Sequence, residues 1–406
     1  MASEWRKHRI KDVVSFVVDN RGKTPPTQDE GHILLEVNAV SATEKFPLYQ
    51  EVRKHVSQEV YDTRFRKGHP KKGDILVPTV GTLGAVSLMD RDDCCIAQNL
   101  IAIRCDEATC HSHFLYYVLC NPMTRKRLLN LNIGGVQPSI KVPHLMELEI
   151  ELPSIGEQKK IAELLSLLDD KILCNNRIND NLYQQALALY RSLFVDFERI
   201  PAAERVASEL GDIPVGWGIK TLSEVTTNIR TRVREHSYKV LSALNSGCLQ
   251  PSEEYFTKQV FSKDISNYIV VDKNDFAYNP ARVNIGSIGL NTLGYIGCVS
   301  PVYVVFRTEP EYHYFMDFFI KSARFKEEVR VRASGSVRQS INYTDFGLIK
   351  IAYPPLAIVR QFNAEYEIIA KCINRNLEEN VALASIRDSL IPKLLAGEID
   401  LSSVTL

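Results

Sequence analysis

The chain of 406 residues lacks any long apolar run. No stretch reaches the roughly 18 consecutive apolar residues that a membrane-spanning helix requires. The N-terminal segment MASEWRKHRI also lacks the apolar core of a secretory signal peptide. These two absences predict a cytoplasmic protein.

Cysteine pairs at metal-binding spacing are missing too. The nine cysteines include no C-x2-C pair and show no regular arrangement, which is typical of free thiols in a reducing compartment. The densest group of possible metal ligands is Cys105, Cys110, His111 and His113. Between zinc and buried free thiols we favour the thiols, so no metal site is expected.

Catalytic signatures are absent as well. The sequence contains no G-x4-G-K-[ST] phosphate loop, no H-E-x-x-H helix, no G-x-S-x-G elbow and no G-x-G-x-x-G opening a helix after a strand. The segment Asn279-Pro280-Ala281-Arg282 begins like the N-P-P-[FY] loop of amino-methyltransferases. It lacks the second proline and the aromatic residue that stacks on a flipped base, so we discount that interpretation.

The chain also lacks an excess of charge of either sign. Lys and Arg total 49, as do Asp and Glu, so no whole-molecule field points to nucleic acid. Basic residues are nevertheless clustered locally, and binding chemistry is what remains.

Tryptophan is scarce, and its two occurrences mark an internal duplication. Trp5 and Trp217 each open a stretch reading W-x4-[IL]-x-[DE]-V. A unit of about 200 residues is far longer than a solenoid repeat and large enough to hold its own core. Two similar modules in one chain suggest a ligand with two similar halves. Further residues align between the two halves: Asp12 with Glu224, Asp74 with Asp275, Gly84 with Gly286, Arg104 with Arg307, and Ser139 with Ser340.

Each half is expected to begin with short strands and loops. Runs rich in β-branched, aromatic and other apolar residues, bounded by Gly, Pro, Asn or Asp, predict strands at 74–77, 100–103, 268–271 and 302–306. Glu alternates with Leu or Ile over 147–152, which predicts a half-exposed strand before Pro153. The segment between Phe197 and Trp217 is interpreted as the linker between the halves.

After Pro153 the pattern becomes that of a long helix. Ser154 and Glu157 have capping-box spacing, and about forty residues without Gly or Pro come next, enough for a helix of about 60 Å. The second half repeats the same apolar seam at an offset of 201 residues. Pro392 is expected to break or kink the second helix near its end, and Gly397 to end any helix beyond that point.

Two asparagines interrupt each seam near its middle, where a buried amide needs a partner. In an antiparallel pair, Asn175 would face Asn380 and Asn179 would face Asn376. The alternative is that they face solvent where the stripe drifts, by about 20° per heptad. The residues expected to pair the helices are Leu168, Ile172, Asn175, Asn179, Leu182, Ile373, Asn376, Asn380 and Leu383.

Basic side chains lie in loops and not in helical ion-pair patterns. In loops they can neutralise phosphates or read guanine. Glycine-containing loops at 134–140 and 335–341 stand at equivalent places and can bring backbone N–H groups close to a ligand. The alternative for each loop is a solvated surface. The segments 81–84 and 286–289 are expected to be tight turns. The candidate DNA-binding residues are Arg21, Lys23, Arg64, Arg66, Lys67, Gly135, Gln137, Ser139, Arg230, Arg232, Arg234, Arg282, Ser336, Arg338 and Gln339.

Together these features resemble the DNA-specificity subunit of a type I restriction-modification system. The resemblance covers the whole chain, and its motifs are specific in their order and spacing. They are the LFVDFE ending of the central helix at 193–198, the opening Ile213-Pro214-x-Gly216-Trp217, and the distal ending Ile391-Pro392-Lys393-Leu394-Leu395-x-Gly397-Glu398-Ile399.

The resemblance implies a subunit without catalysis of its own. Each recognition domain would read one half of a bipartite, asymmetric site in double-stranded DNA, while the helices act as a spacer and dock two methyltransferase subunits. Those partners would bring S-adenosylmethionine, and separate restriction and translocase subunits would bring ATP and Mg; this chain would bind no cofactor. The half-sites should differ in sequence, because 69 residues separate Trp5 from Asp74 but only 58 separate Trp217 from Asp275.

The expected fold class is α+β, with two similar α/β target-recognition domains joined by two long antiparallel coiled-coil helices in an internal pseudo-two-fold repeat. Two other function classes stay open: a coiled-coil scaffold with globular protein-binding ends, and a self-contained enzyme with an unseen motif. The expected divisions are 1–153 for the first recognition domain, 154–198 for the central helix, 199–355 for the linker and second domain, and 356–406 for the distal helix.

Overall fold

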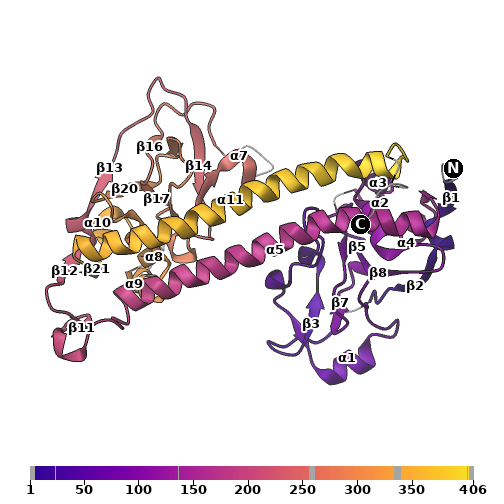
Figure 1. Ribbon diagram of the computed structural model, residues 1–406, viewed down its shortest axis with the longest axis horizontal. Helices are drawn as coiled ribbons and strands as arrows, with labels where there is room; N and C mark the ends of the chain where they lie inside the picture. The colour runs from indigo at the N-terminus through magenta and orange to yellow at the C-terminus, as the bar shows by residue number, and fades with distance from the viewer. Residues whose placement is uncertain are drawn as a thin grey trace. The chain divides into compact units, whose positions relative to one another are not determined.

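The computed structural model describes residues 5–22, 24–135, 137–255, 261–332, 340–399 and 401. They form two compact units: unit 1 comprises Met1–Arg177 with Arg375–Leu406, and unit 2 comprises Ile178–Asn374. Each unit contains part of both long helices, α5 (Ile155–Phe194) and α11 (Leu356–Leu395) (Figure 1). No helix in these ranges is long and apolar enough to cross a membrane. The four-part division expected from the sequence stays a prediction.

The two long helices have the lengths that their sequences predict. α5 spans 40 residues and begins after Ser154, whose Oγ accepts a hydrogen bond from the N–H of Glu157 at 3.4 Å. α11 also spans 40 residues and continues through Pro392 to Leu395, so the expected break is wrong. A proline within the last turn removes only one helical hydrogen bond near an end that frays anyway. Gly397, with φ of +68°, lies just beyond the helix.

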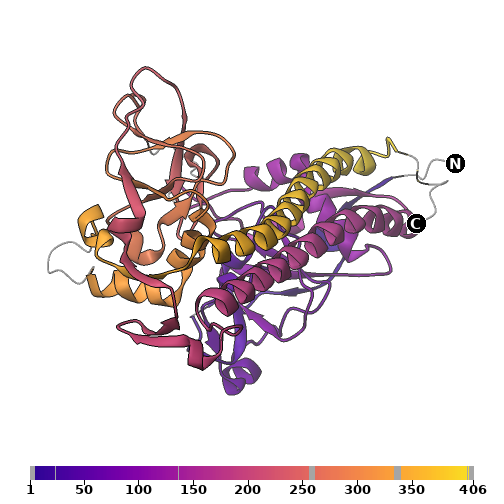
Figure 2. The same ribbon diagram turned by 60° about the vertical axis from the view of Figure 1, so that its left-hand side comes forward.

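Within unit 1 the two helices run antiparallel. Lys171 of α5 contacts Glu379 of α11, whereas Asp169, nearer the start of α5, contacts Arg387, further along α11. Residue numbers therefore fall along one helix as they rise along the other. In unit 1 the helices lie side by side in both views (Figure 1 and Figure 2).

Asn175 is fully buried in this helix pair. Its Nδ2 donates to Asn380 Oδ1 at 2.9 Å and to Glu379 Oε2 at 2.8 Å, and Asn380 Nδ2 donates to Asn176 Oδ1 at 2.8 Å. The first of these bonds is the one that the antiparallel register predicts, so Asn175 does not face solvent. The pairing of Asn179 with Asn376 stays a prediction.

Among its described residues, unit 1 carries three sheets. A four-stranded antiparallel sheet has the order β2-β8-β5-β6, a three-stranded sheet β4-β3-β7 includes the parallel pair β3-β7, and β1 pairs antiparallel with β9. In β9 the buried Ile150 and Leu152 alternate with exposed glutamates, as expected. The bounds are β1 Arg6–Arg9, β2 Val14–Val18, β3 His32–Leu35, β4 His55–Val56, β5 Ile75–Pro78, β6 Ser87–Leu88, β7 Cys94–Ile96, β8 Leu100–Cys105, β9 Glu149–Leu152, α1 Gln58–Arg64, α2 Ser112–Cys120, α3 Pro122–Asn130 and α4 Val142–Met146.

Unit 2 repeats this plan. Its sheet β13-β20-β17-β18 corresponds to β2-β8-β5-β6, its pair β12-β21 corresponds to β1-β9, and its sheet β15-β14-β19-β16 again contains one parallel pair, β14-β19. The linker is a hairpin of β10 and β11, which the sequence did not predict. The bounds are β10 Arg205–Ser208, β11 Gly211–Pro214, β12 Gly218–Thr221, β13 Thr226–Ile229, β14 Lys239–Ala243, β15 Leu249–Pro251, β16 Ile269–Val271, β17 Phe276–Tyr278, β18 Ile288–Leu290, β19 Gly297–Val299, β20 Val304–Thr308, β21 Lys350–Tyr353, α6 Leu222–Val225, α7 Ser252–Tyr255, α8 His313–Lys321, α9 Ala323–Arg332 and α10 Tyr343–Gly347.

The repeat extends to an ion pair on a buried aspartate, which the aligned residues form in each unit. Arg104 donates through Nε and Nη2 to the two oxygens of Asp74 at 2.9 and 2.7 Å. Arg307 makes the same two bonds to Asp275 at 2.5 and 2.9 Å. Each aspartate also accepts a backbone N–H from three residues earlier, that of Lys71 or Asp272, which closes the turn before a core strand. These matched ion pairs belong to the fold that the two halves share.

Each unit has a large apolar core that takes residues from both long helices. In unit 1, Leu165 of α5 and Leu394 of α11 pack in one cluster with Phe114 of α2. In unit 2, Phe194 of α5 and Phe362 of α11 stack edge to face with ring centroids 5.3 Å apart. The helices are therefore part of each core and not free rods.

The glycine segments are only partly the tight turns that we expected. Gly81, Gly84 and Gly286 have φ of +88°, +79° and +90°, which suits turns. Gly289 instead lies within β18, so that expectation is wrong for it. A Cβ on Gly289 would lie 2.7 Å from the backbone carbon of Cys248, so the close approach of two chain segments explains the glycine.

Candidate nucleic-acid interface

Unit 1 contains a basic cleft of about 560 Å³ that two separate loops line. One loop follows β2, and the other follows α1 and includes the end of that helix. Ile96 at the end of β7 and Gln98 complete the lining. Its charged lining consists of four cations and one carboxylate, so the local charge is positive although the chain as a whole is neutral. The cleft brings together four of the residues expected to bind DNA: Arg21, Arg64, Arg66 and Lys67.

The side chain of Asn20 joins the two loops of this basic cleft. Its Oδ1 accepts from the N–H of Lys67 at 3.0 Å, and its Nδ2 donates to the carbonyl of Gly68 at 2.8 Å. Phe65 is buried among Leu34 and its neighbours, which leaves Arg64 and Arg66 on either side exposed. The backbone is thus fixed while the cationic side chains face outward, as a phosphate or base site requires.

Arg21 is held by Asp19 within the same loop. Its Nε donates to Asp19 Oδ1 at 2.7 Å and its Nη2 to Oδ2 at 2.6 Å. The hydrogen bonds that Arg21 donates to Asp19 raise the pKa of Arg21, which stays cationic. A phosphate would have to compete with Asp19 for this guanidinium. Lys23 lies outside the described residues.

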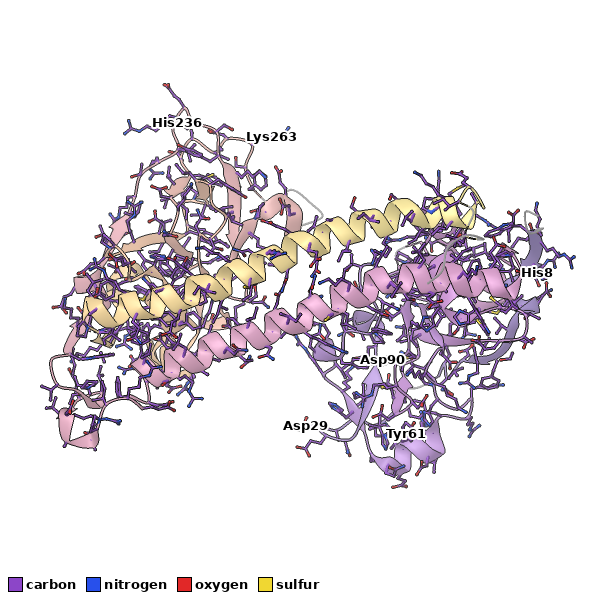
Figure 3. All side chains as sticks on the ribbon, in the orientation of Figure 1. His8, Asp29, Tyr61, Asp90, His236 and Lys263 are labelled. Atoms are coloured by element: carbon purple, nitrogen blue, oxygen red, sulfur yellow. The ribbon has the colours of Figure 1, made fainter. Side chains whose placement is uncertain are left out.

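Three stacked rings lie next to the basic loop in sequence or space. The ring of Tyr61, on α1 (Figure 3), lies 3.9 Å from that of His32 and 3.7 Å from that of His69, measured between centroids. His32 belongs to β3, and His69 directly follows the loop. Burial lowers the pKa of His69 and favours its neutral ring. Sequence reasoning missed these rings and Asn20, because their partners come from distant segments.

The glycine-containing loop of unit 1, residues 134–140, is a turn held by hydrogen bonds and does not line the basic cleft. Asn132 Oδ1 accepts from the N–H groups of Gly134 and Ser139, both at 2.9 Å. A Cβ on Gly134 would lie 1.9 Å from the carbonyl oxygen of Gln137, so only glycine fits there. The side chain of Gln137 and the backbone of Gly135 are exposed, whereas Ser139 bridges to Val80 in an isolated β-bridge.

The arginine triplet of unit 2 follows an extended segment beside residues 266–269. The N–H of Val233 donates to the carbonyl of Tyr268 at 2.9 Å, and Val233 is fully buried. Its neighbours Arg232 and Arg234 therefore face outward, and Arg230 is also exposed. Arg232 Nη1 donates to the carbonyl of Asn267 at 2.7 Å.

Two further basic residues of unit 2 were not among the candidates. Figure 3 places His236 and Lys263 at the same outer edge of this unit, and both are exposed. They extend the exposed basic segment that contains Arg234. Nothing in their sequence neighbourhood marks them, because folding brings the two loops together, through hydrogen bonds that include those of Val233 and Arg234 to residues 266–268.

Arg282 lies beside the second glycine loop. It is exposed, and its N–H donates to the carbonyl of Asn279 at 2.9 Å. The neighbouring carbonyl of Pro280 accepts from the N–H of Ile341, which ends that loop, as Thr79 does for Ile140 in unit 1. The candidates Ser336, Arg338 and Gln339 lie outside the described residues.

The group of Cys105, Cys110, His111 and His113 in unit 1 consists of two buried thiols and two half-buried imidazole rings. Cys105 and Cys110 are free and buried. The hydrogen bond with Cys110, followed by burial, raises the pKa of Cys105 well above that of an ordinary thiol. In the ranges that the structure covers, no three His, Cys, Asp or Glu side chains are placed to hold a metal ion.

The chain is similar to a family of known proteins. The family model described as the type I restriction modification DNA specificity domain matches residues 2–184. The type I restriction enzyme MjaIX specificity subunit of Methanocaldococcus jannaschii is 27% identical over 307 residues, which cover 71% of this chain and 69% of that protein. The HindI specificity subunit of Haemophilus influenzae is 23% identical over 399 residues, which cover 81% of this chain and 87% of that protein.

A solved structure has the same fold. The type I restriction-modification S subunit from M. genitalium superposes with a TM-score of 0.53 at 17% sequence identity, covering 97% of this chain and 96% of that one. At this identity the likeness concerns the arrangement of helices and strands.

Proposed function

We propose a function for this chain as a DNA-specificity subunit of a type I restriction-modification system. Each of its recognition modules would read one half of a bipartite, asymmetric DNA site. The chain itself would catalyse no reaction. One observation carries this proposal: unit 1 gathers four cationic side chains from two distant loops into one cleft whose backbone is fixed. Such an arrangement suits contacts with phosphates and guanine edges.

The difference between the two units supports an asymmetric site. Both keep the same arrangement of strands and the same pair of a buried aspartate with an arginine. Their basic features differ, since unit 1 has a cleft between loops and unit 2 has an extended arginine triplet beside residues 266–269. Two units of the same fold that present different basic residues to DNA would recognise different base sequences.

The exposed faces of the long helices support the docking of partner subunits. In unit 1, Leu167 of α5 is 54% exposed, and Leu377 and Val381 of α11 are 49% and 72% exposed. Large apolar side chains on solvent-facing helix surfaces are typical of protein interfaces. We assign them to two methyltransferase subunits, with the helices setting the gap between the half-sites.

The partner subunits would supply the chemistry. S-adenosylmethionine would bind to the methyltransferase subunits, and ATP with Mg to restriction and translocase subunits where the system contains them. A cytoplasmic location fits this assignment, because the genome is the substrate.

Methylation by the reconstituted complex tests the proposal. The chain purified with its methyltransferase partner should methylate DNA at a motif of two parts separated by a fixed number of unread bases, and neither protein alone should do so. Methylation by this chain without a partner would overturn the proposal in favour of a self-contained enzyme. Partner binding without any sequence preference would favour a protein-interaction scaffold.

A further inference from the structure

The two facing asparagines of the helix pair do not by themselves select which helices pair. The offset of 201 residues places Asn376 at the position of Asn175, and Asn380 at that of Asn179. If two copies of α5 paired in the same antiparallel register, Asn175 of one would still face Asn179 of the other. Asn175 would lose only its second bond, because Ile178 stands at the position of Glu379. The asparagines set the register, so the main basis for partner choice is another feature.

A buried polar group of unit 1 breaks this equivalence. Arg387 of α11 donates through Nη1 to Asp169 Oδ1 of α5 at 2.6 Å, and Tyr117 of α2 donates through its hydroxyl to Asp169 Oδ2, also at 2.6 Å. The side chains of Asp169 and Arg387 are only 5% and 14% exposed. Burial alone would lower the pKa of Arg387, but Asp169 and Asp388 raise it overall, so the guanidinium is charged.

Unit 2 has apolar residues at the three equivalent positions. Arg387 corresponds to Ala186, Asp169 to Ala370 and Tyr117 to Phe318. Ala186 is fully buried and shares an apolar cluster with Phe318. The charged group therefore exists only once in the repeat.

We propose that the Asp169–Arg387–Tyr117 group selects the helix partner: it makes the helix of the N-terminal half pair with that of the C-terminal half, and not with the same helix of a second copy. In a pair of two α5 helices, each Asp169 would face Ala186. In a pair of two α11 helices, each Arg387 would face Ala370. In both like-with-like assemblies a buried charge loses its opposite charge on the facing helix, which destabilises them. Asp169 would keep only the Tyr117 hydroxyl, and Arg387 only Asp388 of its own helix.

The selection matters because a duplicated chain is prone to exchange its equivalent parts between copies. Like-with-like pairing would join two copies of one recognition module. Such an assembly would present a symmetric reader in place of an asymmetric one. The inference itself concerns pairing alone and stands whether or not the chain binds DNA.

A nicked protein tests the selection. A protease site inserted in the hairpin turn between Glu209 and Leu210 allows the folded full-length chain to be cut in two. The cut protein is unfolded in urea, returned to buffer, and its assemblies are identified by native mass spectrometry. The same is done for the variant Asp169→Ala/Arg387→Ala and for the control Arg360→Ala/Glu311→Ala, which removes an exposed ion pair that α11 makes away from the asparagines.

The wild type and the control should return only the pairing of unlike halves. In the Asp169→Ala/Arg387→Ala variant, the equilibrium constant for exchange of unlike pairs into like-with-like pairs should rise by on the order of 10³-fold. The reason is that the variant has no buried charge that could lose its opposite charge. The packing of the remaining seam is identical in the two proteins and cancels from this comparison. Equal distributions for wild type and variant would overturn the proposal.

The intact chain provides a check that needs no reassembly of halves. Asp169→Ala alone and Arg387→Ala alone should each lower the urea midpoint of unfolding more than the double variant does, because each single change leaves a buried charge without its partner. If the double variant were destabilised as much as the two single variants together, the group would not have the coupling that selection requires. That result would overturn the proposal as well.

Discussion

Asn20 shows how a single side chain joins the distant segments that form the basic cleft. Its amide bonds the backbone of both Lys67 and Gly68, so the loop after β2 and the loop after α1 move as one body. The arginines that face the cleft are long and flexible, and a fixed backbone reduces the entropy lost when they bind. Asn20 is therefore a positioning residue for the basic cleft.

Removal of this clamp should weaken both the fold and DNA binding. We expect Asn20→Ala to lower the free energy of unfolding by about 1–2 kcal/mol, because two hydrogen bonds are removed, and to raise the Kd for the cognate duplex by about tenfold. Asn38→Ala is the matched control, because Asn38 Nδ2 donates to the carbonyl of Glu51 at 2.9 Å in the same unit. Fluorescence anisotropy with the assembled complex measures the affinity. Equal reductions of affinity in the two variants would contradict the positioning role.

His113 makes the stability of unit 1 depend on pH. Burial, followed by the nearby Lys45 and His111, lowers its pKa to about 4. The unfolded chain binds a proton near pH 6.5 and the folded chain does not, so stability is full above pH 6.5 and falls as the pH drops toward 4. Since the ring is partly accessible to solvent, we expect a loss of roughly 1–2 kcal/mol.

Urea unfolding at a series of pH values measures this effect. The variant His113→Phe keeps an aromatic ring at the site but cannot take up a proton. It should show a flatter dependence than the wild type between pH 6.5 and 4. Identical slopes for both proteins would rule out His113 as the cause.

At the scale of elements, the long helices could be predicted from sequence far better than the loops. Forty residues of apolar seam and a capping serine are a strong local signal, and α5 begins within one residue of the expected position. The hairpin β10–β11 carries no such signal, because its strands are four residues each and their pairing with each other decides the structure. The stacking of His32, Tyr61 and His69 was equally out of reach, since it joins β3, α1 and a loop.

The helices also lead to a prediction about spacing. Seven residues inserted after Leu182 and seven before Ile373 would lengthen both helices by about 10 Å without disturbing the seam. With DNA rising about 3.4 Å per base pair, the preferred gap between half-sites should grow by about three base pairs while both half-sites keep their sequence. Methylation of a library with randomised gap lengths measures this preference. An unchanged gap would mean that the partner subunits, and not these helices, position the recognition modules.

At the scale of the whole molecule, the duplication is what the sequence makes plainest. Two tryptophans and a set of matched positions predicted two similar modules, and the structure adds that the matched Asp74–Arg104 and Asp275–Arg307 form the same ion pair. The candidate site was predictable only as a set of basic loop residues. Four of them meet in one cleft, whereas the arginine triplet belongs to the other unit, and only folding decides such groupings.

The proposed function requires that the two modules read DNA independently of each other. The sharpest test is the methylation map of the assembled complex carrying Arg64→Ala/Arg66→Ala/Lys67→Ala, compared with the complex carrying Arg230→Ala/Arg232→Ala/Arg234→Ala. The first variant should lose base preference in one half of the motif, by about 1–3 kcal/mol for each hydrogen-bonded base that is no longer read, and leave the other half unchanged. The second variant should do the reverse. If either variant relaxed both halves equally, or only weakened methylation at every site alike, the two modules would not be independent readers and the proposed function would be wrong.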